Sequence, residues 1–195
     1  MSSPSDEKTA HTTTAEFSPE DRHTLLRIGH ESILSSFTDR ATPKPPSAPS
    51  LSEPRGVFTT LYLEGKLRGC VGYATAAAPL YRGVAETARA AAFEDPRFHP
   101  VARQEAPELK IALSVLSPLF PIQADEVEVG RHGLVVALGG RRGLLLPQVP
   151  VEYGWDNESF LEQTCRKAGL PLDAWRRGAS LEAFTAEVFG DEGAH

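Results

Sequence analysis

The chain has 195 residues, enough for one domain or a domain with a small appended lobe, and its 41% hydrophobic and 24% charged residues are typical of a soluble globular protein. The formal net charge of −6 argues against a general nucleic-acid-binding protein, which needs a basic surface to displace counterions from phosphates. No apolar run is long enough to span a membrane, and the N-terminus lacks the apolar core of a secretory signal. Two cysteines, Cys70 and Cys165, do not make a disulfide framework, so we expect a cytoplasmic protein with free thiols and no membrane partner.

The first quarter of the chain is expected to contain a tail, a helix and a connector. Residues 1–16 are rich in Ser, Thr and charge, which predicts a disordered tail. Ser18 can cap a helix and Pro19 suits its first position, and the apolar residues that follow have helical spacing. Residues 41–55 hold five prolines, which excludes a regular helix or a central strand there. We interpret this stretch as a surface connector, with a mobile lid as the alternative.

Residues 57–63 and 66–73 are predicted to form a β-hairpin. They flank Glu64-Gly65, a two-residue turn with glycine where a positive φ is useful. Regular pairing outward from this turn places Thr59 opposite Cys70.

The rest of the chain mixes strands and helices without a regular βαβ alternation, which predicts an α+β fold with a mostly antiparallel sheet flanked by helices. The predicted elements are a helix over 79–94, a strand over 109–116, short strands over 127–129, 134–138 and 143–146, a helix from 156 to about 168, and a final strand over 181–189, with a helix as the alternative for this last segment. Cys165 falls on the apolar side of the second of these helices, so we interpret it as a small core residue.

The stretch LRGCVGY, residues 67–73, holds the sharpest candidate for chemistry. A thiolate is the reactive form of cysteine, and a nearby cation lowers the pKa of a thiol. Since side chains alternate along a strand, Arg68 and Cys70 would share one face. Gly69 and Gly72 would let a ligand, or another element of the fold, approach the strand closely. The simpler interpretation is a buried cysteine in a tight hairpin whose glycines serve packing.

A cysteine nucleophile normally needs a base, and two histidines are candidates. His99 lies beside proline, and His132 lies in a glycine-flanked turn. Neither spacing establishes proximity to Cys70. The chain has no CxxC or HExxH metal motif and no phosphate-binding glycine motif, so we expect no metal site, and the cofactor is left open.

Three further polar residues are candidates for binding. Asp95 and Arg97, in the sequence DPRF, either tie a loop down or form an anion clamp together with Arg68. Gln148 follows a leucine-rich strand and Pro147, so its amide is suited to hold a loop or a ligand.

Several stretches in a fixed order resemble one known family. The motif LRGCVGY is similar to its LRGCIG motif, with Val71 in place of isoleucine, and AAFEDPRFHPV is similar to its AAxxDPRFxPV segment. The further matching stretches are SVLSPLFPI, VGRHGLVV, RGLLLPQVPVEYGWD, FLEQTCRKAGLP and FTAEVF. By these motifs the chain resembles the AMMECR domain family, named for the Alport syndrome, intellectual disability, midface hypoplasia and elliptocytosis chromosomal region. Its prokaryotic members are called AmmeMemoRadiSam system protein A.

The resemblance implies a domain over residues 17–190, made of two α+β subdomains, followed by a short tail over 191–195. It implies two partners, a Memo-like protein and a radical SAM enzyme, and it supplies no reaction. Three interpretations follow for the LRGCVG motif: a site in an enzyme or enzyme-accessory protein, a docking surface in a non-catalytic interaction module, or a site that presents a small molecule to the radical SAM enzyme.

Overall fold

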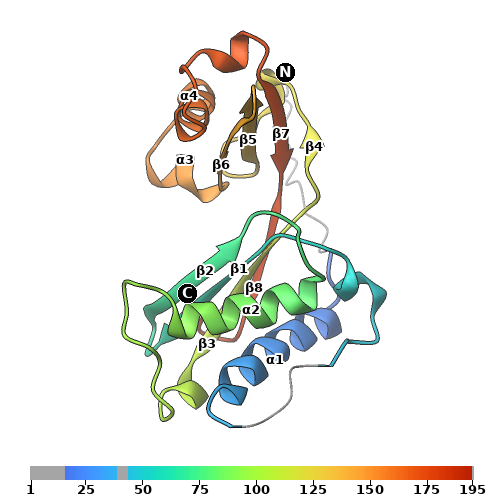
Figure 1. Cartoon of the computed structure of the whole chain (residues 1–195), viewed down its shortest axis with the longest axis vertical. Helices are drawn as coiled ribbons and strands as arrows, with labels where there is room; N and C mark the ends of the chain where they lie inside the picture. The colour runs from blue at the N-terminus through green and yellow to red at the C-terminus, as the bar shows by residue number, and fades with distance from the viewer. Residues whose placement is uncertain (1–15, 39–43, 195) are drawn as a thin grey trace, which may run out of the picture.

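The computed structural model describes residues 16–38 and 44–194, and it contains two four-stranded antiparallel sheets, each with its own helices (Figure 1). The α+β fold predicted from the sequence is therefore confirmed. Of the predicted N-terminal tail only Glu16 lies within the described residues, and residues 41–43 of the proline-rich segment lie outside them. Within the described ranges no helix is both long and apolar enough to cross a bilayer.

The first subdomain is a sheet in the order β2-β1-β3-β8, with α1 and α2 side by side across one face (Figure 1). Its strands are β1 Val57–Leu63, β2 Lys66–Tyr73, β3 Lys110–Leu116 and β8 Ala186–Gly190. Its helices are α1 Pro19–Ser35 and α2 Leu80–Phe93, with short 3-10 turns at Pro49–Ser52 and Ala106–Glu108. Because β2 is an end strand of the sheet, one edge of β2 faces away from β1.

Local sequence explains both helices. The Ser18 side chain accepts a hydrogen bond from the Asp21 backbone N–H and Pro19 opens α1, as predicted. Small residues then let the two helices approach each other and the sheet. A Cβ added at Gly29 of α1 would lie 3.7 Å from Ala88 of α2 and 3.0 Å from Ile111 of β3.

The second subdomain is a sheet in the order β4-β7-β5-β6, packed against α4. Its strands are β4 Phe120–Pro121, β5 Gly133–Leu138, β6 Arg141–Leu145 and β7 Ser180–Phe184. Its helices are α3 Gln148–Glu152 and α4 Asn157–Lys167, with 3-10 turns at Ala124–Glu126 and Ala174–Arg176. Asp156 caps α4 by accepting from the Ser159 N–H.

The prediction of one final strand is wrong, because residues 181–189 contribute to both sheets. Strand β7 belongs to the second subdomain and β8 to the first, and Thr185 alone separates them (Figure 1). Ser117 accompanies this crossing: its N–H donates to the Thr185 carbonyl at 2.9 Å, and its Oγ accepts from the Thr185 N–H at 3.0 Å. The chain stays extended through the crossing. The alternation of side chains between the two faces therefore continues through Thr185, and the sequence does not show the change of sheet.

Two other local differences have simple causes. The predicted strand at 127–129 is a loop that follows the 3-10 turn at Ala124–Glu126. Strand β4 and helix α3 were not predicted, because two and five residues are too few to show a hydrophobic period.

The two subdomains share a small apolar cluster. Leu116 of β3, Val135 of β5 and Phe184 of β7 are buried together, and Phe58 of β1 packs against them. The two subdomains are thus packed as one domain, as the family resemblance implied.

Candidate functional site

The hairpin has the predicted strands, but its pairing differs from the predicted one. Leu61 pairs with Gly69 while Tyr62 pairs with Leu67, so Arg68 is the extra residue of a β-bulge. Cys70 therefore lies opposite Thr60, and the predicted partner, Thr59, is wrong. A bulge adds one residue to one strand and shifts all pairing beyond it, which counting outward from the turn does not detect.

Both glycines of the motif are explained by close packing. A Cβ at Gly69 would lie 2.1 Å from the Ala91 carbonyl oxygen of α2, which is the close approach expected at this position. A Cβ at Gly72 would lie 2.2 Å from the ring of Phe58. The helix therefore covers one face of β2 and the Phe58 ring the other, and a ligand-binding role for these glycines stays a prediction.

Cys70 is half-buried, and its backbone groups point away from β1. Its N–H donates to Asp95 Oδ2 at 2.8 Å, and its carbonyl accepts from Arg97 Nη2 at 3.4 Å. Since these groups are not used by β1, Thr60 and Cys70 form a non-hydrogen-bonded pair, the type in which facing side chains lie closest. The Thr60 hydroxyl accordingly donates to the Cys70 sulfur at 3.3 Å.

Asp95 and Arg97 form a compact ion pair at the edge of β2. Asp95 is buried, and its Oδ1 accepts from the backbone N–H and Nε of Arg97 at 3.1 and 3.0 Å. Its Oδ2 accepts from Arg97 Nη2 at 2.7 Å as well as from Cys70. The Arg97 hydrogen bond, reinforced by the Cys70 N–H, holds the pKa of Asp95 well below its usual range despite burial. Asp95 is therefore a carboxylate at every physiological pH.

The cation that contacts Cys70 is Arg97, through the Cys70 backbone carbonyl. The hydrogen bond to Asp95 raises the pKa of Arg97. The Arg97 guanidinium is more than half exposed, whereas the Asp95 carboxylate is not. The arrangement thus presents a positive charge to solvent beside a half-buried sulfur.

Arg68, the cation expected beside Cys70, points to a different partner. Its Nε and Nη2 donate to the two carboxylate oxygens of Glu105, both at 3.1 Å, and its Nη1 donates to the His99 carbonyl at 2.9 Å. The same hydrogen bonds lower the pKa of Glu105, and the Ala102 N–H adds to the effect. Arg68 therefore ties the segment after DPRF to the hairpin, and its role in an anion clamp stays a prediction.

Sequence reasoning missed two residues of this site, Thr60 and Glu105. Glu105 carries a weak local signal, because a carboxylate three residues after Ala102 is placed to accept the Ala102 N–H, here at 2.7 Å. Thr60 carries none, since only the bulge brings it opposite Cys70.

The two candidate bases lie apart from this group. His99 contributes its backbone carbonyl, and its side chain is exposed. His132 is buried in the second subdomain, where its Nδ1 accepts from the Glu128 N–H at 3.1 Å and its ring meets Phe120 edge-on. Burial lowers the pKa of His132. Its contacts are thus made within its own turn and sheet, and its predicted role as a base stays a prediction.

Gln148 lies exposed at the start of α3 in the second subdomain.

Within residues 16–38 and 44–194 no three His, Cys, Asp or Glu side chains gather in a way that could hold a metal ion. The residues that the structure brings together are Cys70, Thr60, Asp95 and Arg97, with Arg68 and Glu105 beside them.

Comparison with known proteins places this chain in a family. The AMMECR1 family profile matches residues 26–189. A protein of Thermococcus gammatolerans is 43% identical over 182 residues, which cover 86% of this chain and 89% of that protein. Protein MK0488 of Methanopyrus kandleri is 41% identical over 186 residues, covering 89% of each chain. The crystal structure of the uncharacterized protein PH0010 from Pyrococcus horikoshii is similar with a TM-score of 0.70 and 41% identity, covering 87% of this chain and 90% of that one. The chain therefore belongs to the AMMECR1 family.

Proposed function

We propose that this protein is an enzyme or enzyme-accessory protein whose functional group is the Cys70 thiol, acting with a Memo-like protein and a radical SAM enzyme. The observation that carries the proposal is a half-buried thiol on a sheet edge that accepts a hydrogen bond from Thr60, in a residue whose backbone carbonyl accepts from the Arg97 guanidinium. The partners rest on the resemblance of the motifs around residues 67–73 and 91–101 to the AMMECR domain family.

The chemistry suits a thiolate that acts as a nucleophile or as a soft ligand. Arg97 favours the negative sulfur by charge, and the Thr60 hydroxyl favours it by donating a hydrogen bond. Asp95 fixes the position of Arg97 through three hydrogen bonds while also holding the Cys70 N–H. The thiol proton is released to solvent, so no histidine is assigned as a base.

Site-resolved alkylation with iodoacetamide tests this proposal. The rate at Cys70 is measured by mass spectrometry from pH 6 to 10, with N-acetylcysteine in the same tube as an ordinary thiol. We expect Cys70 to react faster than N-acetylcysteine at the acidic end of this range. Arg97→Gln should slow Cys70 by about threefold there, the scale of one solvent-exposed charge interaction.

Arg68→Gln is the matched control for Arg97→Gln. It removes a cation two residues from Cys70 whose partners are Glu105 and the His99 carbonyl, so the rate at Cys70 should be unchanged. A Cys70 rate that follows N-acetylcysteine at every pH, and that Arg97→Gln leaves unaltered, would overturn the thiol proposal.

A second candidate function, a docking surface on the hairpin, is favoured by two exposed apolar side chains. Leu67 and Tyr73 lie near the two ends of β2 and are 42% and 49% exposed. The Asp95–Arg97 pair occupies the strand edge between them, so a partner would contact these side chains rather than extend the sheet at Cys70. The double variant Leu67→Ser/Tyr73→Ser should then lose binding to the Memo-like or radical SAM protein of the same organism, while Cys70→Ser binds normally. Unchanged binding by the double variant would remove this candidate.

A further inference from the structure

A cavity of about 550 Å³ lies at the junction of the two subdomains. Ala74 and Leu116 line it from the first subdomain, and Arg142, Leu144 and Phe184 from the second. Its volume falls within the range of small-molecule sites, roughly 300–1,000 Å³, and such sites occur preferentially where two structural units meet. The cavity is therefore large enough and suitably placed for a small ligand.

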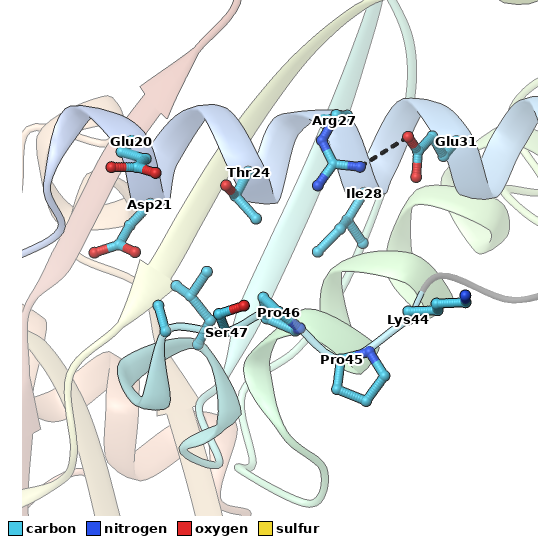
Figure 2. A pocket seen from close by; sticks show the side chains of 12 residues that line it. Glu20, Asp21, Thr24, Arg27, Ile28, Glu31, Lys44, Pro45, Pro46 and Ser47 are labelled. Carbon is cyan, nitrogen blue, oxygen red and sulfur yellow. Dashed lines mark hydrogen bonds and ion pairs between the residues drawn. The ribbon is translucent and has the colours of Figure 1, made fainter.

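The charge of the lining is unusual for this chain. The described lining includes Arg55 and Arg142 and no carboxylate, although the chain has 26 acidic and 20 basic residues. The cavity of about 680 Å³ between α1 and the proline-rich segment is different (Figure 2). Three carboxylates, from Glu20, Asp21 and Glu31, accompany the two cations in its lining. The junction cavity thus differs from the α1 cavity in having cations but no carboxylate in its lining.

The two arginines of the junction cavity have different roles. The Arg55 side chain is only 9% exposed and is held by Glu16, by the Leu116 carbonyl at 3.3 Å and by Glu53 at 3.5 Å. Arg55 is therefore held in place, and its charge is balanced by carboxylates that do not line the cavity. The Arg142 side chain is 56% exposed, and its nearest carboxylate, on Glu182, lies 3.7 Å away, beyond hydrogen-bond distance. Arg142 is therefore the cation that a ligand can engage.

The rest of the lining is largely apolar. Leu144 and Phe184 belong to the cluster that joins the subdomains, and Leu119 is 38% exposed beside them. We infer that this cavity binds a small organic anion with an apolar body, whose carboxylate or other acidic group pairs with Arg142 while its hydrocarbon part packs on Leu119 and Leu144. This inference is independent of the Cys70 proposal, because it assigns a second site and needs no thiol chemistry.

Fluorescence titration of the full chain with 8-anilinonaphthalene-1-sulfonate tests the inference, since this probe is itself an anion with an aromatic body. We expect saturable binding at one site, displaced by octanoate but not by octanol at the same concentration. Arg142→Gln should weaken the probe and octanoate by roughly fivefold, the scale of one charge-assisted contact near solvent. Leu119→Ser should weaken both as well, through lost apolar contact.

Arg141→Gln is the matched control, because Arg141 is the neighbouring residue of β6 but donates to the Gly169 carbonyl at 2.7 Å. It should leave both affinities unchanged, and circular dichroism of each variant should match the parent. The inference is overturned if the folded protein gives no saturable signal, if octanol competes as well as octanoate, or if Arg141→Gln and Arg142→Gln have equal effects.

Discussion

The two cysteines of this chain lie in contrasting surroundings. Cys70 is half-buried on a sheet edge, with a hydroxyl, a guanidinium and a carboxylate around it. Cys165 is fully buried in α4 among Val136 and Ala174, and burial raises the pKa of its thiol. The comparison shows how strongly the environment, rather than the residue type, separates a candidate functional thiol from a core residue.

The cause of the contrast is where the backbone finds its hydrogen bonds. In α4 the backbone groups bond within the helix, so no polar side chain is needed beside Cys165. At the edge of β2 the outward N–H and C=O of Cys70 have no neighbouring strand, and Asp95 and Arg97 bond them instead. Charged side chains therefore lie next to Cys70 because they form hydrogen bonds with its outward-facing backbone groups.

The largest effect is expected from Gly69→Ala, because this substitution would displace the strand that carries Cys70. The new Cβ would lie 2.1 Å from the Ala91 carbonyl oxygen, and backbone on both sides leaves no flexible group to yield. We expect a loss of about 3 kcal/mol of unfolding free energy, measured by urea denaturation.

Gly65→Asn, in the turn of the same hairpin, is the control for Gly69→Ala. Gly65 has φ +73°, which asparagine tolerates, and no atom lies within 4 Å of an added Cβ. Its cost should stay below about 1 kcal/mol. Equal losses for the two variants would show that Gly69 is not there for the contact with α2.

Asp95→Asn should have the next largest effect, because it removes the negative charge that holds Arg97 in place. The new amide NH₂ would also face the N–H groups of Arg97 and Cys70, with which it cannot form hydrogen bonds. We expect a loss of about 2 kcal/mol at pH 7. The pKa of Asp95 is lowered by folding, so its contribution is fully present above the unfolded value of about 3.9 and is lost progressively as the pH falls from there toward the lower pKa of the folded protein. Urea titrations of both proteins at pH 7 and pH 3 should therefore show the difference shrinking in acid.

Asp173→Asn controls for a general effect of removing a carboxylate. Asp173 pairs with Arg177 one helical turn away, and both side chains are well exposed. Its loss should change stability by less than about 0.5 kcal/mol at either pH. An Asp95→Asn difference that is as small as this, or that grows in acid, would contradict the role assigned to Asp95.

The elements of the first subdomain could be predicted because their signals are local. The cap at Ser18 marks α1, and the turn at Glu64-Gly65 with alternating apolar residues marks the hairpin. The change from β7 to β8 could not be predicted, because an extended chain that leaves one sheet and enters another keeps the same alternation.

The candidate site was predicted in its parts but not in its assembly. Cys70 and Arg97 were both identified, yet they meet across 27 residues of sequence, and spacing carries no information over such a distance. Arg68 looked like the partner of Cys70 because two residues along a regular strand share a face. The bulge at Arg68 removed that regularity.

Serine substitutions test directly whether Cys70 and Cys165 differ in their contribution to stability. Cys165→Ser places a more polar hydroxyl in an apolar cluster and should cost about 1–2 kcal/mol. Cys70→Ser keeps a group that can bond the Thr60 hydroxyl and should cost less than about 0.5 kcal/mol. Thermal unfolding of the two variants under the same conditions checks the order, and a larger loss for Cys70→Ser would mean that Cys70 is the structural cysteine.

The smallest expected effect is that of Thr60→Val, which removes a single hydrogen bond to the sulfur while keeping the shape of the side chain. The Thr60 hydroxyl lies 3.3 Å from the Cys70 sulfur, and a hydroxyl without charge stabilises a thiolate less than the Arg97 guanidinium does. We expect Cys70 to alkylate about twofold more slowly at pH 7, with the unfolding free energy changed by less than about 0.5 kcal/mol. The alkylation rate of Cys70 in the double variant Thr60→Val/Arg97→Gln is the decisive measurement. If hydroxyl and guanidinium act independently on the thiolate, the two reductions in rate should multiply, whereas coupling through Cys70 would make the combined reduction differ from the product. A double variant no slower than Arg97→Gln alone would mean that Thr60 only packs against Cys70, leaving Arg97 as the sole source of activation.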